Sequence, residues 1–242
     1  MKNNKVLITG GTAGIGRAIS ILLAKHGYQI FLIGRSRKKM NDLLQDLEEL
    51  NLADQFVFSL TDVTDLTIFE KQIMDWENQY GTFDVLINNA GIGYDTVLGK
   101  SIKDIQYLVN TNLLSYMWLA GHIGEQMIIN GIEGYIIQIG SMSATTKDAE
   151  SSGYVATKSG IQGFSEALRK ELNPKNIRVA LIEPGLCGSD MQSTSPKEEI
   201  VLQEKLEMLK AEDIADLVLT ILRLDPRIDV CELKVKPLKQ II

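Results

Sequence analysis

Three side chains near the middle of the sequence have the types and spacing needed for proton transfer. Ser141 follows a short apolar run, Tyr154 lies 13 positions later, and Lys158 follows four positions after that. On a helix, a spacing of four places two side chains on one face, one turn apart. A phenol with a pKa of ~10 is a poor acid–base catalyst at neutral pH, but a nearby ammonium lowers that pKa. The pattern predicts Tyr154 as an acid or base beside Lys158, with Ser141 hydrogen-bonding a substrate oxygen.

A glycine-rich segment near the N-terminus is a candidate phosphate-binding loop. Residues 9–16 read Thr-Gly-Gly-Thr-Ala-Gly-Ile-Gly, directly after an apolar run at residues 6–8 and before a helical pattern that ends at Lys25. Glycines let a pyrophosphate approach the backbone, and the following helix N-terminus offers unpaired N–H groups. The position after the first apolar run favours a dinucleotide site, although turn geometry alone also accounts for glycines in such a loop.

The residues after the second apolar run bear on which dinucleotide binds. Residues 34–39 read Gly-Arg-Ser-Arg-Lys-Lys, with no acid before Asp42. An NAD site usually offers a carboxylate here to the ribose hydroxyls, whereas a guanidinium can grip a 2′-phosphate through two N–H donors. Arg35 therefore predicts NADP, as NADPH in the reducing direction. The basic residues 37–39 are interpreted as the solvated start of a helix.

These groups need a scaffold of buried strands that alternate with helices. Apolar runs occur at residues 6–8, 30–33, 56–58, 85–87, 135–139 and 179–182, and a weaker seventh at 233–235 is interrupted by Lys234. Such runs are typical of strands buried on both faces, as in a parallel sheet. Helical patterns include residues 40–50 and 206–222, the latter as one or two helices with Asp213 as a candidate cap near a helix start. We predict an α/β fold over residues 1–242: a single-domain, Rossmann-like, doubly wound parallel sheet of about seven strands with helices on both faces.

Composition and charge argue against several classes of function. Among the 242 residues, 25 are Lys or Arg and 31 are Asp or Glu, which gives a net charge of −6. That balance argues against nucleic-acid binding and against attraction to an anionic membrane. The two cysteines and two histidines show no metal-ligand spacing, and no apolar run approaches the ~18 residues of a membrane span. We expect no metal, no nucleic-acid partner, no membrane partner and a cytoplasmic location.

The motifs together resemble the short-chain dehydrogenase/reductase family, in its compact single-domain subgroup. The resemblance covers nearly the whole chain and rests on Thr-Gly-x3-Gly-x-Gly at residues 9–16, Asn-Asn-Ala-Gly at residues 88–91 and the Ser-Tyr-Lys spacing. It implies that Ser141, Tyr154 and Lys158 are the catalytic set, with Ser143 as a rival for the serine role.

A fourth catalytic residue implied by the resemblance is an asparagine on the helix before the fifth strand. Asn112 matches the family position, and Asn110 is the alternative. The implied role is to hold a water that passes protons from solvent to Lys158 and Tyr154. The alternative for either asparagine is a purely structural role, in which its side chain hydrogen-bonds to the backbone of its own helix.

The resemblance also implies a cofactor-binding set spread along the chain. Asp62 and Val63 would lie near the adenine, residues 88–91 would line the cofactor's path, and the loop after the sixth apolar run would close over the nicotinamide carboxamide. Asp62 can also be read as a turn or cap residue, and Ser189 stands where the family usually has Thr. The set comprises Gly10, Thr12, Gly14, Ile15, Gly16, Arg35, Asp62, Val63, Asn89, Ala90, Gly91, Tyr154, Lys158, Pro184, Gly185 and Ser189.

The resemblance implies an NADP(H)-dependent oxidoreductase that transfers a hydride between nicotinamide and a carbonyl or secondary alcohol. The tail from Ala211 is similar to a branch with 3-hydroxy-acid and serine dehydrogenases and 3-oxoacyl-carrier-protein reductases, so a 3-hydroxy acid or 3-oxoacyl substrate is expected. The alternative is a non-catalytic, NADP-binding redox sensor, a class that typically lacks the Tyr or the Lys. The apolar helix at residues 108–123 corresponds to one that packs on its symmetry mate in the family, which implies a homodimer or homotetramer.

Overall fold

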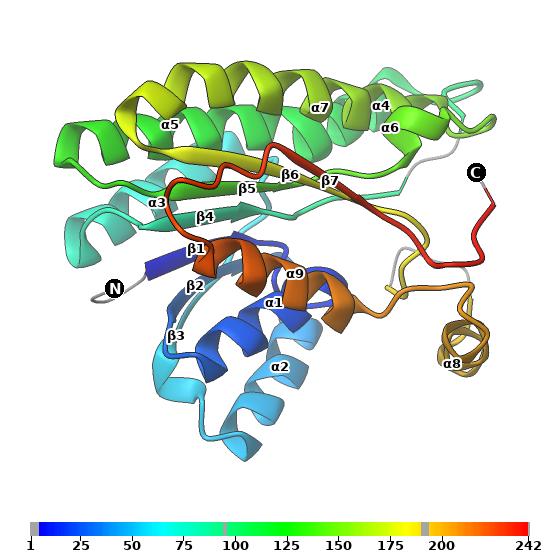
Figure 1. Ribbon diagram of the computed structural model, residues 1–242, viewed down its shortest axis with the longest axis horizontal. Coiled ribbons are helices and arrows are strands. Elements are labelled where there is room, and N and C mark those ends of the chain that lie inside the picture. The colour runs from blue at the N-terminus through cyan, green and yellow to red at the C-terminus, as the bar shows by residue number, and fades with distance from the viewer. Residues whose placement is uncertain (1–4, 94–95, 190–193, 242) are drawn as a thin grey trace.

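A parallel β-sheet runs through the centre of the molecule (Figure 1). A computed structural model describes residues 5–93, 96–189 and 194–241. Within them, the order across the sheet is β3 (Phe56–Leu60), β2 (Gln29–Gly34), β1 (Lys5–Thr9), β4 (Val85–Asn88), β5 (Tyr135–Ile139), β6 (Arg178–Pro184) and β7 (Glu232–Val235). The chain builds outward from β1 to β3, crosses back to β4, and builds outward again to β7. The predicted doubly wound, seven-stranded sheet is confirmed.

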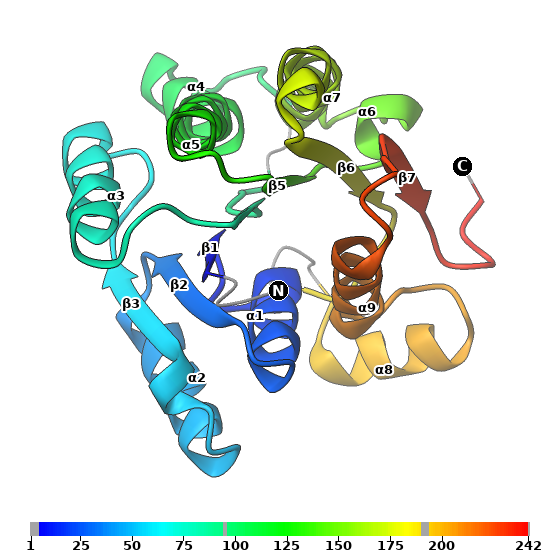
Figure 2. The ribbon, with the colours of Figure 1, turned by 60° about the vertical axis from the view of Figure 1, so that its left-hand side comes forward.

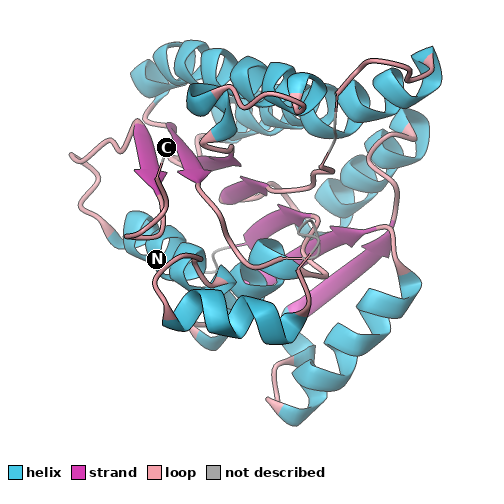
Figure 3. Cartoon of the chain, turned by 90° about the vertical axis from the view of Figure 1, so that its right-hand side faces the viewer, coloured by secondary structure: helices cyan, strands magenta, loops and turns pink. Residues whose placement is uncertain are grey.

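Helices cover both faces of the sheet (Figures 2 and 3). One face carries α1 (Gly14–Lys25), α2 (Arg37–Glu49) and α9 (Ala211–Arg223), and the other carries α3 (Leu66–Tyr80), α5 (Ser115–Asn130) and α7 (Ser152–Leu172). The shorter elements are α4 (Ile102–Val109), α6 (Ser143–Thr146), α8 (Pro196–Glu204), two 3-10 turns (Ala53–Gln55 and Asn173–Lys175) and a π-helical turn (Asn110–Leu114) that joins α4 to α5. Across the described ranges, no helix is long and apolar enough to cross a membrane.

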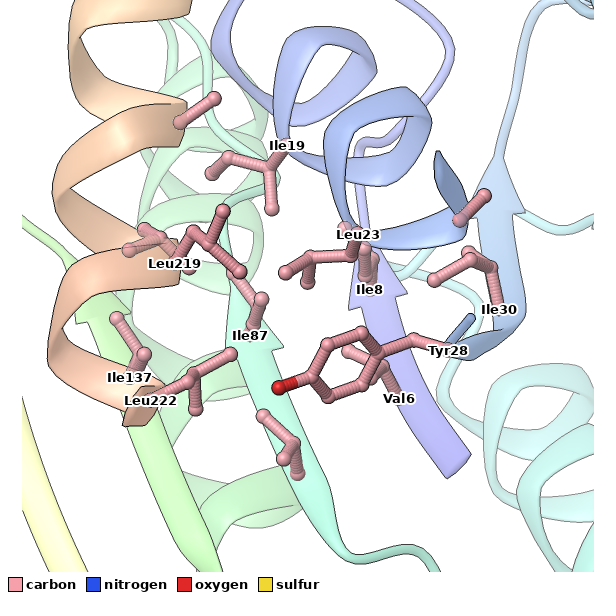
Figure 4. Close-up of a cluster of buried hydrophobic side chains, with 14 of the residues drawn as sticks. Val6, Ile8, Ile19, Leu23, Tyr28, Ile30, Ile87, Ile137, Leu219 and Leu222 are labelled. Carbon is pink, nitrogen blue, oxygen red and sulfur yellow. The ribbon is translucent and has the colours of Figure 1, made fainter. Parts of the chain in front are cut away.

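The apolar strands supply both hydrophobic cores at once. Successive strand side chains point to opposite faces, so Val6 and Ile8 pack with α1 and α9, whereas Leu7 between them packs in the other core. Figure 4 shows Ile19 and Leu23 of α1 lying against the first of these cores. Each such side chain stabilises the fold by ~1.5–3 kcal/mol when buried. Two-sided burial explains why the runs are continuous rather than alternating.

The seventh strand contains a lysine because it lies at the edge of the sheet. Lys234 is part-exposed, and its ammonium lies 2.7 Å from a carboxylate oxygen of Glu232 and 3.8 Å from one of Glu183 on β6. Charged side chains are typical of sheet edges, where they discourage pairing with another chain. The interruption that weakens the sequence pattern is therefore a property of the edge position.

Of the one or two helices predicted over residues 206–222, the helical placement of Leu206 and Leu209 was wrong, because both lie between α8 and α9. Leu206 has a left-handed φ of 62°, and Leu209 pairs by backbone hydrogen bonds with Leu186 and Gly188 in the loop after β6. These backbone pairs replace a helical ladder, so α9 begins only at Ala211. Asp213 caps it as predicted, since its carboxylate accepts a hydrogen bond from the backbone N–H of Lys210 at 2.8 Å.

Candidate active site

A cavity of about 850 Å³ lies at the carboxyl ends of the strands, where loops from both halves of the sheet meet. This is the place where doubly wound sheets bind ligands, because the strand order reverses there, between β1 and β4. All the predicted site residues except Gly16 and Asn112 line it, namely Gly10, Thr12, Gly14, Ile15, Arg35, Asp62, Val63, Asn89, Ala90, Gly91, Ser141, Tyr154, Lys158, Pro184, Gly185 and Ser189. The fold thus brings segments from the whole chain to one cleft.

Two glycines, Gly10 in the loop after β1 and Gly16 in the first turn of α1, have no room for a side chain. Gly10 has a φ of +66°, and a Cβ there would lie 2.7 Å from the Cα of Ala90. A Cβ on Gly16 would lie 2.5 Å from the carbonyl oxygen of Gly10. The helix α1 then begins at Gly14 with no side-chain cap and no acid in its first turn. An uncapped N-terminus against a narrow backbone cradle fits the pyrophosphate of a dinucleotide.

The loop after β4 is tied to the glycine loop by side-chain hydrogen bonds. The Asn89 amide donates to the carbonyl oxygens of Thr9 and Gly10 at 3.1 and 3.0 Å. In return, the Thr9 hydroxyl accepts from the backbone N–H groups of Asn89 and Ala90, both at 3.1 Å. These four bonds close the switch point of the sheet and fix the spacing between two walls of the cavity.

Three side chains from separate elements meet at the end of the cavity that follows β2 and β3. The hydroxyl of Tyr107 on α4 donates to Asp62 at 3.0 Å and accepts from the Arg35 guanidinium. Asp62 also accepts from the backbone N–H and the hydroxyl of Thr64, at 2.9 and 2.7 Å. Partial burial acts to raise the pKa of Asp62, but these hydrogen bonds and the nearby Arg35 charge outweigh it and lower that pKa. Asp62 is therefore a firmly held carboxylate that faces the cavity. Its hydrogen bond from the Thr64 backbone also fits the alternative interpretation, in which Asp62 is a turn residue.

The predicted catalytic residues lie at the opposite end, beyond β5. Ser141 follows β5, and Tyr154 and Lys158 share one face of α7. The Lys158 ammonium is buried, donates to the Ile139 carbonyl oxygen at 2.9 Å, and lies 5.7 Å from the Tyr154 ring centroid. The rival Ser143 also lines the cavity, and its backbone N–H donates to the Ser141 hydroxyl at 3.2 Å.

Burial dominates the electrostatics of this group. It lowers the pKa of Lys158 to about 8, against a smaller opposing effect of Glu183. It also raises the pKa of Tyr154, and the hydrogen bond with the Ser141 side chain offsets this only in part. The expectation that Lys158 makes the phenol more acidic was therefore wrong for the polypeptide alone. The reason is that a buried phenolate is poorly solvated, while the ammonium is anchored on a backbone carbonyl.

Asn112 supports the cavity from behind its wall. Its amide oxygen accepts from the backbone N–H of Ile92, and its amide nitrogen donates to the Ile92 carbonyl oxygen, both at 2.9 Å. The same nitrogen reaches the hydroxyl of Thr157 on α7 at 3.3 Å. A Cβ added to Gly91 would lie 3.6 Å from the Asn112 amide oxygen and 3.9 Å from the Lys158 ammonium nitrogen. Asn112 thus fixes the segment after β4 beside Lys158.

The loop after β6 closes the third side of the cavity. Ser189 lies against the glycine loop, since a Cβ on Gly14 would be 3.1 Å from its own. Gly185 lies under the C-terminal tail, where Gln240 accepts a hydrogen bond from the backbone of Leu186 at 3.0 Å. Burial raises the pKa of the Cys187 thiol to about 12, so this cysteine stays protonated and is no nucleophile.

Lys39, Gln240 and Tyr107 are among the residues at the cavity that the sequence patterns did not predict. Lys39 lines it, although residues 37–39 were interpreted as a solvated helix start. Lys39 is the third residue of α2, close to the N-cap Ser36, which also lines the cavity. The predicted helix start could therefore have placed Lys39 near the site. Gln240 lines the cavity from a tail with no local motif, and Tyr107 stands behind Arg35 and Asp62 without any sequence signal.

In the described ranges, no three His, Cys, Asp or Glu side chains lie close enough to hold a metal ion. The two histidines have local roles. His122 on α5 is hydrogen-bonded to Glu77 on α3 at 2.7 Å, and His26 ends α1.

Comparisons with known proteins agree with this fold and cleft. The sequence profile of the short chain dehydrogenase family matches residues 4–200. The chain is 35% identical over 190 residues to 3-oxoacyl-(acyl-carrier-protein) reductase FabG of Chlamydia muridarum, covering 78% of this chain and 76% of that protein. It is 27% identical to the NADP-dependent 3-hydroxy acid dehydrogenase YdfG of Shigella flexneri, with coverage of 97% and 95%. A solved structure of serine dehydrogenase from Escherichia coli is 26% identical with a TM-score of 0.81, covering 98% of this chain and 100% of that chain.

The chain belongs to the short-chain dehydrogenase family, and it is an oxidoreductase that acts on a small-molecule substrate. The family resemblance stated from the motifs is confirmed. The relative from Shigella flexneri is NADP-dependent by name.

Proposed function

We propose that the chain is an NADP(H)-dependent reductase or dehydrogenase that interconverts a carbonyl compound and a secondary alcohol. The observation that carries this proposal is one cavity with Ser141, Tyr154 and Lys158 at one end and Arg35 and the glycine loop at the other. A dinucleotide held along that cavity would supply or accept the hydride. The protein's part is to hold the reactants and to move a proton.

In the reducing direction, the Tyr154 hydroxyl donates its proton to the carbonyl oxygen of the substrate. The raised pKa of Tyr154 keeps the phenol protonated at neutral pH, which is the form that a proton donor needs. The Ser141 hydroxyl donates a hydrogen bond to the same oxygen as negative charge develops on it. In the oxidising direction the roles reverse, and Tyr154 receives the proton of the alcohol.

Lys158 and Asn112 act around that proton transfer. The Lys158 ammonium stabilises the phenolate that remains after Tyr154 has given up its proton, and it also holds ribose hydroxyls of the cofactor. The proposed proton relay runs from solvent through a water near Asn112 to Lys158 and Tyr154. The support for it is the π-helical turn at Asn110–Leu114, since such turns are frequent at functional sites, and the contact of Asn112 with the segment beside Lys158.

The substrate is proposed to be of the 3-oxoacyl or 3-hydroxyacyl class. Beyond Ser141 and Tyr154, the described lining carries Met142, Thr146 and Asp148, and Lys158 is its one cation at that end. The carboxylate of Asp148 repels a free carboxylate placed near it. An ester or thioester is uncharged at the same position and is not repelled. This lining favours the 3-oxoacyl ester over the free 3-oxo acid. A purely sensory function is disfavoured, because both Tyr154 and Lys158 are present at the cleft.

The proposal is tested by the oxidation of NADPH in the presence of 3-oxoacyl thioesters. We expect turnover with the wild-type protein, lower activity on the free 3-oxo acids, and a fall in kcat of ~10²-fold or more for Tyr154→Phe, the scale of general acid catalysis. The control is Tyr80→Phe, which removes the same atom at the opposite end of the sheet. If Tyr154→Phe retains wild-type kcat, the assignment of the proton donor is wrong.

The cofactor proposal is tested by titrating NADPH and NADH into the protein. A hydrogen bond to a charged group contributes ~1.5–3 kcal/mol, but Arg35 is half-exposed and exposed ion pairs are screened. We therefore expect a preference for NADPH of about tenfold, near the lower bound of that range. Arg35→Ala should weaken NADPH and leave NADH nearly unchanged, whereas Lys38→Ala, an exposed neighbour, should change neither. Equal binding of the two cofactors to the wild type would contradict the choice of NADP.

The proposed assembly is a homodimer or homotetramer. The joined helices α4 and α5 leave Val109, Leu114 and Met117 exposed, and Gly121 has open space around it. Light scattering should give two or four times the chain mass of 26.9 kDa, and Met117→Glu should reduce it. The matched control is Met74→Glu on α3, where a methionine is similarly exposed. A wild-type mass of one chain at micromolar concentration would count against the proposal.

The cytoplasm stays the proposed compartment, supported by two unpaired cysteines.

A further inference from the structure

A cluster of three charged or polar side chains joins separate parts of the fold at the cofactor end of the cavity. Arg35 follows β2, Asp62 follows β3, and Tyr107 lies on α4. The Tyr107 hydroxyl is hydrogen-bonded to both Arg35 and Asp62, and the Arg35 guanidinium carbon lies 5.7 Å from the Tyr107 ring centroid. Arg35 and Asp62 line the cavity, whereas Tyr107 does not. Tyr107 can therefore act on a ligand only through its two partners.

The chemistry of the three groups fixes the direction of the hydrogen bonds. A carboxylate can only accept and a guanidinium can only donate, so the single phenol proton goes to Asp62 and the phenol oxygen accepts from Arg35. Asp62 is held from its other side by the backbone and hydroxyl of Thr64. The Tyr107 oxygen is therefore a fixed acceptor rather than a rotating one, and it gives Arg35 one defined place.

The same arrangement leaves Arg35 and Asp62 as a long ion pair in which the Tyr107 hydroxyl, rather than a direct hydrogen bond, joins the two groups. The closest nitrogen–oxygen distance between them is 4.0 Å, and the Tyr107 hydroxyl bonds to both. A direct bidentate pair would occupy two guanidinium donors. In the described residues, Nη1 is the guanidinium nitrogen that makes a hydrogen bond, and the other nitrogens keep their donors for a ligand.

We propose that Tyr107 is a positioning residue for cofactor choice, which holds the Arg35 guanidinium at the cavity wall for the 2′-phosphate of NADPH. This inference rests on the proposed use of NADPH. Arg35 is half-exposed, and a long side chain loses rotamer freedom when it is ordered by a ligand. A side chain that is already placed loses less on binding. Tyr107 thus strengthens the contact that distinguishes NADPH from NADH without touching either.

The experiment is a titration of both cofactors, followed by their fluorescence, into the wild type, Tyr107→Phe, Arg35→Ala and the double variant. Tyr107→Phe should raise the Kd for NADPH by about 3- to 10-fold, which corresponds to ~0.7–1.4 kcal/mol. The Kd for NADH should stay within about twofold, because NADH has no 2′-phosphate for Arg35 to hold and only small indirect effects of the substitution remain. In the Arg35→Ala background, Tyr107→Phe should have no further effect on NADPH, because the two residues act as one unit.

A second pair of probes isolates the phosphate from the rest of the cofactor. Adenosine 2′,5′-diphosphate should lose affinity for Tyr107→Phe by the same factor as NADPH, while adenosine 5′-monophosphate should not. The matched control is again Tyr80→Phe, which should bind both cofactors as the wild type does.

The outcomes separate this inference from the function on which it rests. If the wild type shows no preference for NADPH, the cofactor proposal falls and this inference falls with it. If the wild type prefers NADPH and Arg35→Ala removes the preference, but Tyr107→Phe binds NADPH normally, the inference alone is overturned. Equal weakening of NADPH and NADH by Tyr107→Phe also overturns it, since that result indicates a structural role. Additive losses in the double variant do the same.

Discussion

The burial of one ammonium group constrains the whole catalytic end of the cavity. Lys158 lies inside the protein and donates to the Ile139 carbonyl oxygen where β5 ends. Lowering its pKa from 10.5 to about 8 corresponds to a cost of ~3 kcal/mol for the charged form. That is a large fraction of the ~5–15 kcal/mol that stabilises a typical domain. Strongly shifted pKa values of this kind cluster at functional sites, which agrees with the role proposed for Lys158.

The neighbouring elements hold the Lys158 ammonium in place through a series of hydrogen bonds. The Ile139 carbonyl is at hand because β5 ends there, and Asn112 fastens Ile92 so that the segment after β4 stays beside it. Asn89 and Thr9 then tie the same segment to the glycine loop. Through these bonds the proposed catalytic end and the proposed pyrophosphate cradle are connected. The proposed hydride transfer depends on the distance along the cavity, which these bonds help to set.

Sequence patterns predicted the features that depend on neighbouring residues. The strands follow from apolar runs, the loop after β1 from its glycines, and the shared face of Tyr154 and Lys158 from a spacing of four. Contacts between distant segments have no such signal: Tyr107 meets Arg35 across 72 positions and Gln240 meets Leu186 across 54. The direction of the Tyr154 pKa was also missed, because burial is a property of the folded chain. The helix expected to include Leu209 begins later for the same reason, since the segment after β6 supplies the backbone hydrogen bonds of Leu209.

Burial in this fold makes Lys158 an unusually acidic lysine, with its pKa lowered to about 8. An NMR titration of the lysine side chains between pH 6 and 12 measures this directly, and Lys158→Met assigns the signal. The account predicts one lysine that loses its proton near a pKa of about 8 and is missing in the variant, while ordinary lysines titrate near ~10.4. A set of lysines that all titrate at the ordinary value would contradict it.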